Sequence, residues 1–66
     1  MSDKLNDLLE RLKTQQRMLI LAMAEHSGLP AGSMLRQVAE LENVIAAVEA
    51  VAAEEADRDR RSSPAA

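Results

Sequence analysis

The spacing of apolar residues in the second half of the chain restricts its fold more than any other feature. Apolar side chains recur there at alternating intervals of four and three residues, which keeps them on one face of an α-helix. Alanine and glutamate, both strong helix formers, fill many of the positions between them. The pattern predicts a helix over residues 33–60 with a seam typical of a coiled coil. The seam consists of Met34, Val38, Leu41, Ile45, Val48 and Ala52, flanked by Val44 and Val51.

A second helical pattern in the first half predicts a helix over residues 3–27. Ser2 or Asp3 can accept a hydrogen bond from a free N–H of the first turn, so either can cap it. Gln15 and Gln16 interrupt the apolar stripe, either to fix the register of the seam or as a partly solvated gap, and we expect the gap. The stripe consists of Leu5, Leu8, Leu9, Leu12, Leu19, Ala22, Met23 and His26.

The residues between the two patterns predict a short connection. Gly28 can adopt the left-handed conformation that often ends a helix, and Pro30 cannot continue one. Leu29 is expected to fold back onto the last turn of the first helix, and Ser33 to cap the second. A connection this short makes neighbouring helices antiparallel. The fold class is therefore all-α, a two-helix antiparallel hairpin.

One domain, residues 1–61, accounts for both helices, followed by a disordered tail over residues 62–66 that has no packing face. A core in a chain of 66 residues rarely supplies more than about 3–5 kcal/mol of stability. The absence of cysteine rules out disulfides, and a single histidine argues against a conventional metal site. We therefore expect no metal and no cofactor, and we expect another protein chain to provide the missing support.

The segment from Met18 to Ala24 carries more apolar surface than one neighbouring helix can cover. Leu19 and Met23 belong to the seam, but Ile20 and Leu21 project from other sides of the helix. Alanines on the back of the second helix would let another helix approach closely. The predicted partner-binding residues are Met18, Ile20, Leu21, Ala24, Leu35, Ala39, Ala46 and Ala50.

The charge distribution argues against nucleic acid as a partner. Residues 33–57 carry one basic and six acidic side chains, which repel phosphate. The chain has no aromatic residue on which a base could stack. Its longest apolar run, residues 18–24, is far shorter than the about 20 residues that cross a bilayer. We therefore expect no membrane span and a cytoplasmic location.

No catalytic residues are predicted. His26 is the only side chain that ordinarily titrates near neutral pH, and a structural role near a helix end is the simpler interpretation. Glu40 with Glu42, and Glu54 with Glu55, lack the buried surroundings that acid–base chemistry requires, and they are read as a solvated surface. We expect a protein that is not an enzyme.

The stretch from Leu41 to Ala52 resembles the second helix of the YscE-type proteins, which are small co-chaperones of type III secretion. Those proteins are also helical hairpins with a glycine-containing turn, as Gly28 and Gly32 would provide here. The resemblance covers residues 28–53 and implies a cytoplasmic partner of a helical-repeat chaperone that keeps a needle subunit from polymerising.

The sequence thus favours a small non-enzymatic protein-interaction module, an adaptor or co-chaperone that docks an apolar helical face on a partner. The alternative is a hairpin that associates with a second copy of itself as a four-helix bundle and acts as a small regulatory protein. A nucleic-acid regulator built on such a bundle ranks below both, because the basic residues of the first helix do not align into a stripe.

Overall fold

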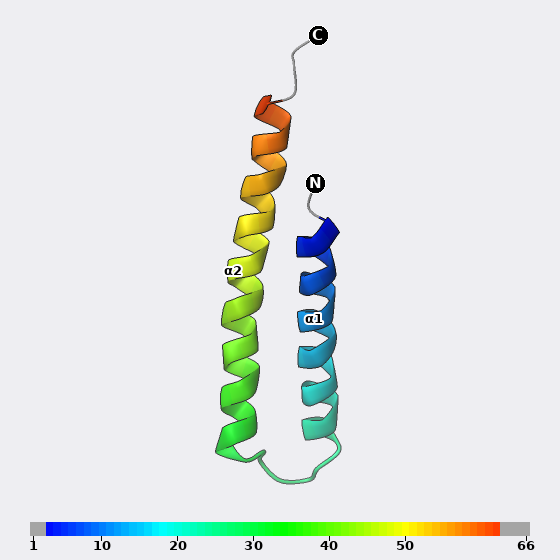
Figure 1. Ribbon diagram of the computed structural model, residues 1–66. Helices are drawn as coiled ribbons and strands as arrows, with labels where there is room; N and C mark the ends of the chain where they lie inside the picture. Colours follow the sequence, from blue (N-terminus) through cyan, green and yellow to red (C-terminus); the bar gives the residue numbers. More distant parts are fainter. Residues whose placement is uncertain (1–2, 63–66) are drawn as a thin grey trace.

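The computed structural model is a pair of antiparallel α-helices joined by a short connection (Figure 1), and it describes residues 3–62. Helix α1 spans Asp3–Ala24, and helix α2 spans Gly32–Ser62 and returns alongside it. No strand occurs within residues 3–62. The predicted all-α hairpin is therefore confirmed.

The helix boundaries differ from the predicted ones by a few residues. Helix α1 ends at Ala24, three residues before the predicted end at residue 27. Helix α2 begins one residue earlier than predicted and continues to Ser62, a residue that the sequence assigned to the tail. Arg60 and Arg61 lie in its last turn, where positive charge is favourable to the exposed carbonyl groups. The predicted cap Ser2 and the rest of the predicted tail, residues 63–66, lie outside the described residues.

The end of α1 is formed by backbone hydrogen bonds that tighten the last turn. The amide of Glu25 donates to the carbonyl of Ala22, and the amide of His26 donates to that of Met23, both at 3.2 Å. These bonds satisfy carbonyl groups that a left-handed cap would otherwise serve. No described glycine has a positive φ, and Leu29 is 96% exposed. The predictions of a left-handed Gly28 and a folded-back Leu29 were therefore wrong.

The start of α2 is also set by the backbone. The carbonyl of Ala31 accepts hydrogen bonds from the amides of Met34 at 3.0 Å and Leu35 at 3.1 Å. Ala31 therefore occupies the N-cap position, since the carbonyl of that residue accepts the first helical bond. Ser33 lies inside the first turn of the helix, so the prediction that it caps α2 was wrong.

Gly28 in the connection and Gly32 at the first residue of α2 should tolerate alanine. A Cβ atom built at Gly28 or Gly32 meets nothing within 4 Å, and neither residue needs a positive φ. Alanine restricts the unfolded chain more than glycine does, so we expect Gly28→Ala and Gly32→Ala each to stabilise the protein by about 0.4–1 kcal/mol. Urea titrations followed by circular dichroism measure the change. A loss of stability in either variant would show that the connection has a conformation different from the one described.

The helices meet along a seam with little fully buried surface. Ile45 is 5% exposed and is the one buried hydrophobic residue among those described. The other predicted seam residues of α2 are half-buried, which confirms the face predicted for this helix. Ala22 of α1 is exposed, as is His26 beyond the end of this helix, and neither belongs to the seam. The half-buried residues of α1 are Leu5, Leu8, Leu9, Leu12, Gln16, Leu19 and Met23.

Gln16 occupies a seam position between the helices. It is half-buried, and its Nε2 donates a hydrogen bond to Oε1 of Glu42 on α2 at 2.9 Å. Gln15 is exposed. The bond joins the two helices at a defined level, as a polar seam residue that fixes register does. Because this hydrogen bond is exposed to solvent, it is compatible with the partly solvated gap expected at this position.

Candidate protein-interaction surfaces

Most of the large apolar side chains that the hairpin does not cover lie on its helices. Among the described residues 3–62, seven large hydrophobic residues are exposed, against one that is buried. Scattered exposed apolar residues are ordinary, so the arrangement of these residues decides whether they form a surface. The exposed residues are Met18, Ile20, Leu21, Leu29, Leu35, Val44 and Val51.

One edge of the seam carries polar contacts between the helices, and we name it the charged edge. Nζ of Lys13 lies 3.3 Å from Oε2 of Glu49, and the Gln16–Glu42 hydrogen bond lies nearby. Residues seven apart lie almost on the same side of a helix. Ile20 follows Lys13 by seven residues, and Leu35 precedes Glu42 by seven. Ile20 and Leu35 therefore share this edge, close to the connection.

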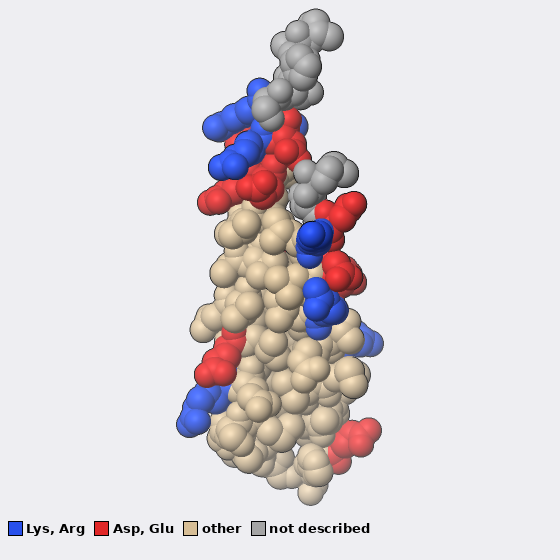
Figure 2. Space-filling model, in the orientation of Figure 1, with Lys and Arg blue, Asp and Glu red and all other residues tan. Residues whose placement is uncertain are grey.

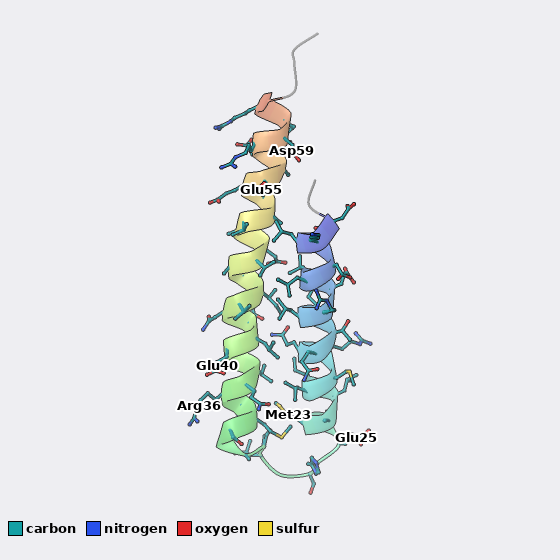
Figure 3. The ribbon with its side chains drawn as sticks, viewed as in Figure 1. Met23, Glu25, Arg36, Glu40, Glu55 and Asp59 are labelled. Carbon is teal, nitrogen blue, oxygen red and sulfur yellow. The ribbon has the colours of Figure 1, made fainter. Side chains whose placement is uncertain are left out.

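The opposite edge of the seam carries no charged residue from Gln37 to Val51, and we name it the uncharged face. Figure 2 views the molecule from this side, where charged side chains lie at the upper end, along the outer side of α2 and over the upper part of α1, and the surface between them is free of Lys, Arg, Asp and Glu. In Figure 3, Arg36 and Glu40 project from the outer side of α2, away from α1. Leu8 is half-buried there, and Val44 and Val51 are 45% and 43% exposed. Two seven-residue rows form the face: Leu8, Gln15 and Ala22 from α1, and Gln37, Val44 and Val51 from α2.

The eight residues predicted to bind a partner are all exposed, but the helical repeat distributes them over several sides. Ile20 and Leu35 lie on the charged edge, and Met18 lies at the margin of the uncharged face. Leu21 and Ala50 lie opposite the seam. The structure thus brings together Ile20 and Leu35 but not the whole set. The remaining three, Ala24, Ala39 and Ala46, lie behind the charged edge.

Val44 and Val51 are the surface residues that the sequence prediction missed. The sequence placed them only as residues that flank the seam, and both are exposed. Their seven-residue spacing, together with that of Leu8, Gln15 and Ala22, was visible in the sequence and could have indicated a second apolar row.

Helix α2 continues beyond the start of α1 (Figure 1), and this overhang is charged. Arg60 and Arg61 pair with Asp57 at 3.5 Å and 3.1 Å, and Arg58 pairs with Glu55 at 3.8 Å. These pairs join residues three or four positions apart, which lie side by side on a helix. A surface hollow here is lined by Glu54, Asp57, Arg58 and Arg61. Exposed pairs of this kind contribute little to stability, and we interpret the overhang as a solvated helix end.

The described residues offer no grouping of three His, Asp or Glu side chains that could hold a metal ion. His26 is exposed and lies beyond the end of α1. Neither α1 nor α2 has the length and apolar content needed to cross a membrane.

The function therefore has to be argued from the two edges of the seam. The sequence matches no protein-family model, no curated protein and no solved structure.

Proposed function

We propose that this chain is a non-enzymatic protein-interaction module, which packs its exposed apolar surface against helices of another protein chain. The observation that carries the proposal is the imbalance between the single buried hydrophobic residue, Ile45, and the seven large hydrophobic residues that remain exposed.

The energies involved make folding and binding interdependent. Fully burying one Val, Leu or Ile side chain contributes about 1.5–3 kcal/mol, whereas the whole core of so small a chain rarely supplies more than about 3–5 kcal/mol. Covering two or three of the exposed residues would therefore stabilise the hairpin by an amount comparable to its own stability. Such a protein acts by association, and its partner completes its core.

Hydrogen exchange of the isolated chain tests this proposal. At a concentration where the chain is monomeric, we expect weak protection of the amides in both helices, because brief openings expose little buried surface. Protection should rise when a partner covers the exposed residues. Strong protection along the whole of α1 and α2 in a dilute monomer would contradict the proposal.

A cytoplasmic co-chaperone is the specific form of this function that the YscE-type resemblance implies. It is supported by the hairpin architecture and by the glycines at the turn, Gly28 in the connection and Gly32 at the start of α2, since the resemblance implies both features for those proteins. The partner would be a helical-repeat chaperone, and Ile20 and Leu35 would be available to it on the charged edge. Calorimetric titration of a purified type III secretion chaperone with wild-type chain and with Ile20→Glu tests this form. Absence of binding by the wild type would contradict it.

A further inference from the structure

We propose that the uncharged face binds a second copy of this chain, with α1 of each copy lying on α2 of the other. This inference rests on the proposed function, since it identifies the partner that completes the core. Its product is a four-helix bundle in which the two-fold axis runs parallel to the helices.

The surface area of the hairpin is large enough to supply such an interface. The chain exposes 5364 Å², whereas a compact monomer of 7.2 kDa exposes about 4,100 Å². The difference, roughly 1,200 Å², exceeds the about 800 Å² that one partner contributes to a standard protein–protein interface. The hairpin therefore has the spare surface that a stable dimer needs.

The composition of the uncharged face suits contact with an identical face. The α2 row of this face, Gln37, Val44 and Val51, contains no charged side chain. Burying this row against a second copy therefore avoids the cost of burying like charges. Val44 and Val51 supply apolar area, and Ala22 allows close approach of a helix. The exposed amide of Gln15 lies within the contact, where it can donate and accept hydrogen bonds.

Two copies can pack this face together symmetrically in two ways, with α2 on α2 or with α1 on α2. The charges of the two helices favour the second arrangement. Helix α1 carries four basic and three acidic residues, whereas α2 carries four basic and seven acidic residues. Placing α2 on α2 would bring two acidic helices together. Placing α1 on α2 brings the basic margin residues Lys4 and Arg11 towards the acidic margin residue Glu54 of the second copy.

The contacts within one hairpin fix which residues meet across the dimer. The Gln16–Glu42 bond and the Lys13–Glu49 pair place Gln15 about level with Val44 on the neighbouring helix. A two-fold axis parallel to the helices preserves this level between copies. Gln15 of one chain therefore lies opposite Val44 of the second copy.

Sedimentation of matched variants tests the face. The wild type is expected to sediment as a dimer at about 100 µM, and Val44→Glu to raise the dissociation constant of the dimer at least about 100-fold, because it buries two unpaired carboxylates. Ala46→Glu places the same charge two residues away on the opposite side of α2, and it should leave the dissociation constant within about threefold of the wild type. Equal weakening by the two variants would overturn the assignment of the face.

Cysteine cross-linking tests the arrangement without relying on a disruptive charge. The chain has no cysteine of its own, so an introduced cysteine is the only residue of each chain that can form a disulfide. Mixed Gln15→Cys and Val44→Cys chains should oxidise to a covalent heterodimer at least about tenfold faster than mixed Val44→Cys and Val51→Cys chains, because disulfides form only between close Cβ atoms. The reverse order would mean that α2 lies on α2, and equal slow rates would mean that no such dimer forms. Either result overturns the proposal.

The mass and the hydrogen exchange of the wild type together separate this inference from the proposed function. A monomeric, weakly protected chain would overturn the second-copy proposal while leaving the interaction module in place with a different partner. A monomeric, strongly protected chain would overturn both.

Discussion

Ile45→Ala is expected to lower the free energy of unfolding by about 2–5 kcal/mol, the range measured for removing a large aliphatic side chain from a core. Ile45 is 5% exposed and lies midway along the seam of α2. Its removal therefore leaves a cavity between the two helices, and water that entered this cavity would contact apolar side chains of both. Because the whole core supplies only about 3–5 kcal/mol, most of the variant should be unfolded at room temperature.

Circular dichroism at 222 nm in a urea titration, at one fixed protein concentration, measures this effect. The matched control is Leu29→Ala, which removes an aliphatic side chain of the same size from a residue that is 96% exposed. We expect the control to change the free energy of unfolding by less than about 0.5 kcal/mol. Similar losses in both variants would mean that the seam is not where the stability resides.

A hundredfold dilution of the wild type is expected to lower its apparent free energy of unfolding by about 2.7 kcal/mol, because two chains separate when a dimer unfolds. The concentration dependence arises from the uncharged face, because Val44 and Val51 become exposed to water when the two copies separate. Thermal unfolding followed from about 1 to 100 µM measures the shift as a change of midpoint.

The control for this measurement is the Val44→Glu variant, which is expected to be monomeric across that range. Its midpoint should be lower than that of the wild type and independent of concentration. A wild-type midpoint that stays constant over the dilution would contradict self-association.

The seam of α2 was predictable from the sequence because periodicity records which side of a helix is apolar. Every residue from Met34 to Ala52 that the spacing assigned to the seam is buried or half-buried. The hairpin followed from this pattern and a short connection. The charged pairs around Asp57 were predictable for the same reason, since partners three or four residues apart must meet on a helix.

The helix ends and the surfaces were harder to predict because they depend on contacts that a single helix does not reveal. Backbone bonds end α1 at Ala24, so the glycine cap suggested by Gly28 was not needed. The sides of the seam could be told apart only after the Lys13–Glu49 contact showed which edge is charged. Composition showed that apolar surface was in excess, but it did not show that Val44 and Val51 share a side while Ile20 lies across from them.

The hairpin topology places the first and last described residues, Asp3 and Ser62, towards the same pole of the molecule, with the connection at the other (Figure 1). In a bundle whose two-fold axis follows the helices, both overhanging segments of α2 would point the same way. The assembly would then be a polar rod, with four chain ends gathered at its charged pole. A domain or fluorophore attached to either end of the chain would be displayed in pairs there, leaving the connection pole and Leu29 unobstructed.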